Sequence, residues 1–242
     1  MKTTVILKLG STIPSLAHEL GDFDEWIRSP LADLGLPMEV VDPRSAAPLP
    51  RLDTLEGVIL TGSHSMVTDN LAWSERIAAW LPDVVARGIP LLGICYGHQL
   101  LARAMGGDVA DNPHGREFGS HRVNLLPHAA DDPLLGSFTP AIGAHLCHTQ
   151  SVVRLPPDAV RLAWSEREPH QAYRVGSCAW GVQFHPEFGE QAMKGYIREC
   201  AGLLSGEGQD PAALERKVVP TPAGTGILRR FMEIVKERGE SS

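Results

Sequence analysis

Cysteine, basic residues and long apolar runs are all scarce in this sequence. Its cysteines are Cys95, Cys147, Cys178 and Cys200. They lie far apart and form no CxxC pair, so neither a zinc site nor a disulfide framework is indicated. We therefore expect a reducing cytoplasmic environment. We also expect all of these residues except Cys95 to be small buried hydrophobic side chains.

Positive charge is outnumbered, since 22 Lys and Arg face 29 Asp and Glu, a formal net charge of −7. The acidic residues are spread along the chain and no basic stripe is present, so we expect no nucleic-acid partner. The first apolar run is only Val5-Ile6-Leu7 before Lys8, too short for a signal-peptide core or a membrane span. We expect no membrane association, and residues 4–8 should form a first strand.

The remaining composition is that of an ordinary soluble α/β protein, with 43% hydrophobic and 21% charged residues in 242. No low-complexity spacer or composition shift divides the interior. We therefore predict one domain over residues 1–205 and a C-terminal extension over residues 206–242.

The first half alternates short apolar runs with segments of helical period. Strands are expected at 4–8, 38–41, 57–60 and 90–94, with one helix before Gly88 and another between Cys95 and Gly106. This alternation predicts an α/β fold with an open, mostly parallel sheet flanked by helices.

The second half is less regular. Pro, Asp and Gly interrupt residues 107–165, where 120–126 and 144–153 read as strands of a small antiparallel section. A strand over 178–184 and a helix over 190–204 should follow. The apolar residues of 227–235 have amphipathic spacing, and we favour a helix that covers the chain's own core over one that binds a partner.

A cysteine stands where an apolar strand meets a helix, in Leu-Gly-Ile-Cys-Tyr-Gly-His-Gln at 92–99. Glycines two residues away on each side make a G-x-nucleophile-x-G turn, with the sulfur of Cys95 in place of a serine oxygen. Such a tight turn strains the backbone and leaves no room for a Cβ at Gly93 or Gly97. The helix start stabilises a Cys95 thiolate, and the N–H of Tyr96 can point at an oxyanion beside it.

A histidine and a carboxylate end another apolar strand, in Gly-Val-Gln-Phe-His-Pro-Glu at 181–187. The carboxyl ends of parallel strands share one edge of a sheet, so this segment should meet Cys95 there. His185 would take the thiol proton and return it to a leaving group, while Glu187 would hold the imidazole in the useful tautomer. Pro186 limits the freedom between them.

These two segments resemble the signature motifs of class I (triad-type) glutamine amidotransferases, nearest to the glutaminase domain of GMP synthase and its stand-alone relatives. The resemblance covers about residues 1–205. It implies a flavodoxin-like fold, Cys95 as nucleophile, His185 as base and acid, and Glu187 as the orienting residue. Other histidines show no metal-ligand spacing, so we expect no metal and no cofactor.

The family's oxyanion loop follows the third strand and corresponds to residues 60–65. Gly62 matches it, whereas Ser63 and His64 stand where relatives often carry Gly and Pro. The donor is main chain, so the N–H of Gly62 or Ser63 could serve together with that of Tyr96. We interpret His64 as a bystander.

The resemblance also implies substrate contacts. It places Gln99 beside the glutamine pocket and turns His148, Thr149 and Gln150 toward the same site, although an ordinary turn with polar caps stays open for these three. Arg116 and Glu117 could frame the entrance, but we favour a solvated hairpin.

The implied reaction is hydrolysis of glutamine through a glutamyl thioester, with ammonia passed to an acceptor. Residues 206–242 are too few for an ATP-using synthase and contain no phosphate loop, so we expect a separate ATP-dependent synthase subunit or a chain that acts alone. One alternative is a γ-glutamyl peptide hydrolase with the same triad. Another is a non-catalytic regulatory or binding subunit. Whether the chain forms a homo-oligomer is left open.

Overall fold

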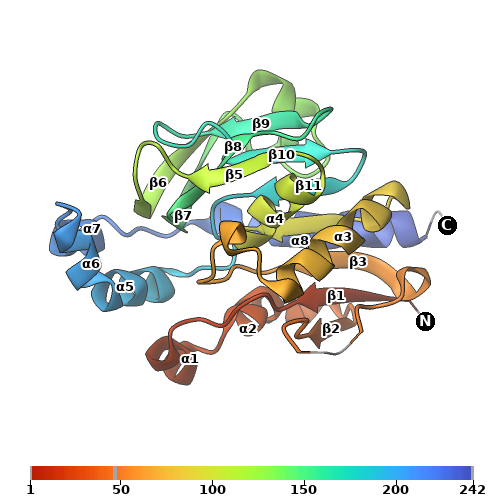
Figure 1. Ribbon diagram of the computed structural model, residues 1–242, viewed down its shortest axis with the longest axis horizontal. Helices are drawn as coiled ribbons and strands as arrows, with labels where there is room; N and C mark the ends of the chain where they lie inside the picture. Colours follow the sequence, from red (N-terminus) through yellow and green to blue (C-terminus); the bar gives the residue numbers. More distant parts are fainter. Residues whose placement is uncertain (1, 46–47, 241–242) are drawn as a thin grey trace.

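The computed structural model describes residues 2–45 and 48–240, and within them nine strands form one sheet in the order β2-β1-β3-β4-β11-β10-β9-β6-β7 (Figure 1). The strands are β1 (Thr3–Leu7), β2 (Met38–Val41), β3 (Leu55–Leu60), β4 (Leu91–Ile94), β6 (Glu117–Leu125), β7 (Ala141–His148), β9 (Val160–Trp164), β10 (Ala172–Val175) and β11 (Ala179–Val182). Strands β2, β1, β3, β4 and β11 run parallel, and β10, β9, β6 and β7 continue the sheet antiparallel. A separate antiparallel pair joins β5 (Asp108–Asp111) to β8 (Gln150–Arg154). The predicted open parallel sheet with an antiparallel section is confirmed.

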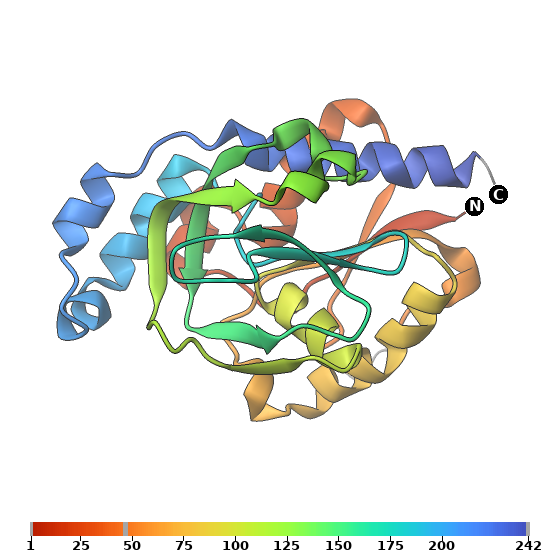
Figure 2. The same ribbon diagram turned by 90° about the horizontal axis from the view of Figure 1, so that it is seen from above.

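Helices cover both faces of the parallel half. The α-helices are α1 (Pro14–Leu20), α2 (Phe23–Arg28), α3 (Ala72–Ala86), α4 (Tyr96–Ala104), α5 (Glu190–Glu199), α6 (Ala201–Gly206), α7 (Pro211–Arg216) and α8 (Pro222–Gly239). Short 3₁₀ helices are η1 (Ser29–Leu34), η2 (Leu52–Thr54), η3 (Val67–Asp69), η4 (Pro127–Asp131) and η5 (Gly136–Phe138). Figure 2 shows α8 along one side of the sheet and α3 along the other, with α5, α6 and α7 grouped at one end. None of the described helices is both long and apolar enough to cross a membrane.

Alternate residues of each parallel strand enter different apolar clusters. In β1, Val5 and Leu7 pack with the side chains of α3 and α4, whereas Ile6 packs with those of α8 and η1. In β3, Val58 and Ile59 divide in the same way. Because both faces are covered, these strands carry continuous apolar runs rather than an apolar and polar alternation.

The C-terminal helix α8 covers the chain's own core, as we favoured from its spacing. Its buried side chains are Ile227, Leu228, Phe231, Met232, Ile234 and Val235. The helix lies so close to β3 that a Cβ on Gly57 would stand 2.7 Å from a Val235 methyl carbon. The division of the chain at residue 205 stays a prediction.

Two segments are divided where the sequence predicted continuity. Residues 144–153 belong to β7 and β8, which pair with different strands, and the break between them is held by His148 Nδ1 donating to the Gln150 carbonyl at 2.9 Å. Residues 190–204 form α5 and α6, which are separated at Cys200. A local bond from a side chain to the backbone can end an element without altering its apolar pattern, which is why the first break was missed.

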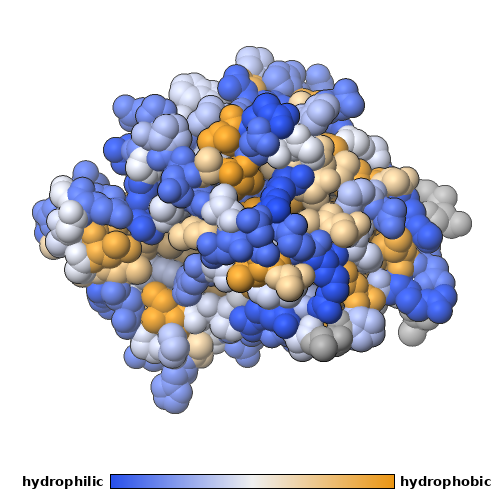
Figure 3. Space-filling model, viewed as in Figure 1, coloured by the Kyte–Doolittle hydropathy of each residue, from blue (hydrophilic) through white to orange (hydrophobic). Residues whose placement is uncertain are grey.

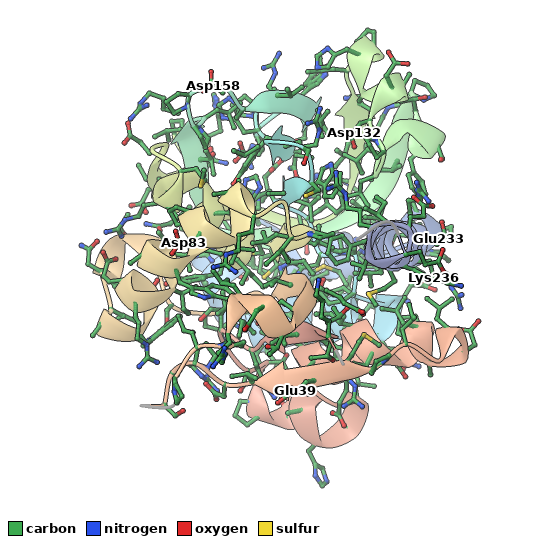
Figure 4. All side chains as sticks on the ribbon, turned by 90° about the vertical axis from the view of Figure 1, so that its right-hand side faces the viewer. Glu39, Asp83, Asp132, Asp158, Glu233 and Lys236 are labelled. Atoms are coloured by element: carbon green, nitrogen blue, oxygen red, sulfur yellow. The ribbon has the colours of Figure 1, made fainter. Side chains whose placement is uncertain are left out.

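Surface charge is dispersed. Glu39 on β2, Asp83 on α3, Asp158 before β9 and Glu233 on α8 are all exposed, and Figure 4 shows these labelled residues on different elements. Figure 3 shows small apolar groups separated by polar ones on the face seen in Figure 1. The acidic balance is therefore not concentrated at one place.

Phe231→Ala is expected to lower the free energy of unfolding by about 3–5 kcal/mol, because a large side chain would be lost from a close-packed interior. Phe231 is fully buried and meets the Trp180 ring edge to face, with centroids 6.4 Å apart. Equilibrium urea unfolding measures the change. Val219→Ala is the control, since Val219 is 51% exposed and should cost less than about 0.5 kcal/mol. Equal losses in the two variants would show that α8 is not part of the cooperative core.

Candidate active site

Cys95 lies in the turn between β4 and α4 with a strained backbone. Its φ of 50° and ψ of −99° are rare for a residue with a Cβ. A Cβ on Gly93 would stand 2.5 Å from the Gly97 carbonyl oxygen, and one on Gly97 would stand 2.5 Å from Leu60 Cβ. Both flanking glycines are therefore required sterically, for the reason that the sequence suggested.

The thiol stands at the start of α4. Gln99 N–H donates to the Cys95 carbonyl at 3.1 Å, which makes Cys95 the N-cap residue. The N–H groups of the first turn, beginning with Tyr96, have no partner inside the helix. They and the helix dipole favour negative charge beside the Cys95 sulfur.

His185 and Glu187 follow β11, the strand next to β4. The register pairs Val182 with Ile94, and Cys95 N–H donates to the Val182 carbonyl at 2.9 Å, so the two motifs meet at one edge of the sheet. Both side chains are buried, and His185 Nδ1 donates to Glu187 Oε1 at 2.8 Å. This contact leaves Nε2 of the ring for other partners.

Charge decides the protonation of this imidazole. Burial alone would lower the pKa of His185, but the Glu187 carboxylate and the Cys95 side chain raise it to about 10. An imidazolium ring is therefore favoured at neutral pH, held between an acidic partner and a thiol that can become a thiolate.

Aromatic side chains fix the orientation of the ring. Phe188 stacks on His185 with centroids 4.0 Å apart at 28°, and Phe23 lies 6.4 Å away at 26°. Trp26 packs edge-on against Phe188 with centroids 5.2 Å apart. Sequence reasoning missed these residues. Phe188 could have been suspected because it directly follows the histidine motif, whereas no pattern marked Phe23 or Trp26.

The loop after β3 passes beside the Cys–His pair. A Cβ on Gly62 would lie 3.1 Å from His185 Cε1 and 3.9 Å from Cys95 Cβ. Ser63 lines the same cavity as Cys95, and its Oγ accepts the Ser65 N–H at 3.2 Å. The structure thus brings Gly62, Ser63 and Tyr96 close to the sulfur.

His64, which we interpreted as a bystander, is part of the cavity wall. Its Nε2 lies 3.0 Å from the Tyr196 hydroxyl, which also accepts from Thr12 Oγ1 at 2.9 Å. Burial, followed by the nearby charge of His185, lowers the pKa of His64. A neutral His64 can therefore accept the Tyr196 proton, and this bond holds α5 against the loop.

The predicted substrate contacts Gln99, His148, Thr149 and Gln150 all line this cavity. Gln99 Nε2 donates to the Gln150 carbonyl and to Gln183 Oε1, each at 2.9 Å. Gln150 Nε2 donates to Thr68 Oγ1 at 2.8 Å. The side-chain nitrogens of Gln99 and Gln150 are therefore already bonded within the protein, and these residues shape the wall.

The expectation of a solvated hairpin at Arg116 and Glu117 is wrong. Glu117 is only 2% exposed and accepts His148 Nε2 at 3.0 Å, Gln171 Nε2 at 3.0 Å and Ser165 Oγ at 2.9 Å. Burial would raise the pKa of Glu117, but the bond and charge of His148 lower it overall. A carboxylate with three buried donors replaces water by protein partners, and its place in the sequence gives no sign of this.

These residues surround a cavity of about 380 Å³. Its lining comprises Ile13, Ser63, His64, Ser65, Met66, Cys95, Tyr96, Gln99, Arg116, Phe118, Cys147, His148, Thr149, Gln150, Tyr196, Cys200 and Leu203. Cys178 is buried elsewhere, as expected, whereas Cys147 and Cys200 are only partly buried and lie in this wall. Burial raises the pKa of the Cys147 thiol well above its usual range. In the described part of the chain, no three His, Cys, Asp or Glu side chains are grouped to hold a metal ion.

A family model, glutamine amidotransferase class-I, matches residues 18–200. The chain therefore belongs to the class I glutamine amidotransferases, a family of enzymes. It is 33% identical over 168 residues to a GMP synthase (glutamine-hydrolyzing) of Aeropyrum pernix, covering 69% of this chain and 31% of that protein. It thus spans about a third of that relative's length.

Shorter relatives match over more of their length. In Haloquadratum walsbyi, one separate chain of the glutamine-hydrolyzing GMP synthase is 30% identical over 191 residues, which cover 74% of this chain and 94% of that one. A gamma-glutamyl-L-1-hydroxyisopropylamide hydrolase of Pseudomonas sp. is 32% identical over 175 residues, covering 69% and 58%.

A solved structure shares the fold across almost the whole chain. A glutamine amidotransferase of Thermotoga maritima superposes with a TM-score of 0.77 at 22% identity, covering 97% of this chain and 98% of that one. At this identity, the likeness is one of fold.

Proposed function

We propose that this chain hydrolyses the side-chain amide of glutamine with Cys95 as nucleophile, His185 as acid and base, and Glu187 as the orienting residue. One observation carries the proposal. A strained cysteine at a helix start shares the sheet edge with a buried histidine that is bonded to a carboxylate at 2.8 Å. Membership of the class I glutamine amidotransferases supports the choice of substrate.

In the first half of the reaction, the Cys95 thiolate attacks the carboxamide carbon and the carbonyl electron pair moves to oxygen. The N–H groups of Tyr96 and of the Gly62–Ser63 loop stabilise that oxyanion. The carbonyl then re-forms, the carbon–nitrogen bond breaks, and His185 gives its proton to the leaving nitrogen. Ammonia departs and a glutamyl thioester remains on Cys95.

In the second half, the now neutral His185 takes a proton from water as that water attacks the thioester. The carbon–sulfur bond breaks, glutamate is released, and the thiolate and imidazolium are restored. Glu187 stabilises the imidazolium at each stage without itself taking the proton.

We propose that the ammonia passes to an acceptor bound by a separate ATP-dependent synthase subunit. The shorter relative from Haloquadratum walsbyi is named as one subunit of GMP synthase, and the longer Aeropyrum pernix relative is about three times as long as the matched region. A division of labour between two chains accounts for both lengths.

A second candidate is hydrolysis of N-substituted γ-glutamyl amides by the same residues. The cavity also includes the apolar side chains of Ile13, Phe118 and Leu203, which could contact a substituent on the amide nitrogen. The matched Pseudomonas hydrolase is named for a substrate of this type. Free glutamine has no substituent to fill such a region.

The purified protein should release ammonia and glutamate from glutamine in equal amounts, and acid quenching should trap a glutamyl adduct on the peptide that contains Cys95. Mass spectrometry detects the adduct, and γ-glutamyl isopropylamide is the matched comparison substrate. A kcat/KM at least about tenfold higher for the isopropylamide would favour the second candidate. Absence of adduct with both substrates, together with no labelling by a glutamine-analogue electrophile, would favour a non-catalytic binding subunit.

A further inference from the structure

The cavity holds one permanent positive charge. Among the described residues that line it, Arg116 is the only Lys or Arg, and none is Asp or Glu. A guanidinium presents a planar set of donors that matches a carboxylate with two parallel bonds. The wall therefore offers one site suited to an anionic group.

Local structure holds Arg116 at this place. Gly115 adopts a φ of 79° in a turn closed by its N–H and the Asn112 carbonyl at 2.9 Å. On the other side, the buried Glu117 anchors the start of β6 through its three donors. The backbone of Arg116 is thus fixed at both neighbours, and its side chain is only 18% exposed.

A carboxylate outside the lining holds the guanidinium from one side. Arg116 Nε lies 3.2 Å and 3.3 Å from the two Glu207 carboxylate oxygens, next to the end of α6. Both contacts use Nε, so neither terminal nitrogen takes part in this pair. Glu207 can therefore position the guanidinium while its terminal groups meet a second carboxylate.

We infer that Arg116 binds the α-carboxylate of the substrate while the γ-amide lies at Cys95. This inference rests on the proposed function, and it applies to glutamine and to γ-glutamyl amides because both carry that carboxylate. A carboxylate leaving water for a cavity needs a charged or hydrogen-bonding partner. Arg116 is thus a specificity-determining residue that selects γ-glutamyl compounds over simple amides.

Arg116→Gln is expected to lower kcat/KM for L-glutamine by at least about tenfold, mainly through KM. L-Glutaminamide, in which the α-carboxylate is a neutral amide, is the matched substrate, and its γ-amide hydrolysis should change less than about twofold. Arg116→Lys should restore part of the loss. Arg198→Gln is the control variant, because Arg198 is paired with Glu215 outside the cavity lining and should leave both substrates unaffected.

Equal losses on glutamine and glutaminamide would overturn the inference and assign Arg116 a purely structural role. Alkylation of Cys95 separates this result from failure of the proposed reaction. If the native protein turns over neither substrate, a chloroketone analogue of glutamine should still label Cys95 more slowly in Arg116→Gln, with iodoacetamide labelling unchanged. Equal slowing with both reagents, unchanged labelling by the analogue or no labelling by it would overturn the inference.

Discussion

Cys95→Ala is expected to reduce glutamine turnover by at least about 10⁴-fold, the largest effect of any single change in this chain. The covalent route needs a nucleophile at this position, and alanine offers none. The oxyanion donors and His185 would remain, and such groups retain only a small part of the catalysis once the nucleophile is lost.

The fold should survive this substitution. Alanine faces the same backbone strain at a φ of 50° as cysteine does, and the recorded bond of the thiol is a weak one to the Cys147 carbonyl at 3.8 Å. Thermal unfolding of Cys95→Ala should therefore lie within about 1 kcal/mol of the native protein. Cys178→Ala removes a buried thiol that lies outside the cavity, and it should keep activity. Turnover above about 1% of native in purified Cys95→Ala would contradict the assignment of the nucleophile.

Much of the parallel half of the fold could be predicted because its signals are local. The predicted strands at 38–41 and 90–94 overlap β2 and β4 almost residue for residue, since continuous apolar runs between turn residues are typical of buried parallel strands. The turn at Cys95 was also predictable. Its glycines are demanded by contacts within one strand-to-helix connection and by the neighbouring Leu60.

The rest of the site depends on partners that only folding brings together. Glu117 reads as a surface residue until His148, Ser165 and Gln171 are placed around it. Phe23 reaches His185 from a distant part of the chain. Such contacts leave no period in the sequence, and for that reason the buried carboxylate and the aromatic packing were both missed.

The C-terminal helix connects this core to the histidine segment. A Cβ on Gly224 of α8 would stand 2.5 Å from the Pro186 carbonyl oxygen, so the helix start lies directly against the backbone between His185 and Glu187. The family model ends at residue 200, before this helix. Residues beyond the matched region therefore contact the segment that we propose to be catalytic.

Glu187→Gln is expected to lower kcat by about 10²–10⁴-fold, because the amide neither fixes the useful tautomer nor stabilises the imidazolium. It should also change the pH dependence. In the native protein, burial lowers the pKa of His185, while Glu187 is the largest of the influences that raise it, to about 10. Without that charge the pKa of His185 falls. The alkaline limb of kcat/KM, which we expect near pH 10 in the native protein, should then move to lower pH.

Stability gives an independent measure of the same charge. A pKa of His185 raised from 6.5 to about 10 contributes stability that is full below pH 6.5 and is lost as pH rises through about 10. Glu187→Gln should therefore be more destabilising in urea unfolding at pH 6 than at pH 10. Glu190→Gln is the control, since Glu190 pairs only loosely with Lys194 at 3.6 Å and should change neither profile. If the alkaline limb stayed in place while kcat fell, Glu187 would orient the ring without setting its charge, and the thiolate would need another source of stabilisation, such as the first turn of α4.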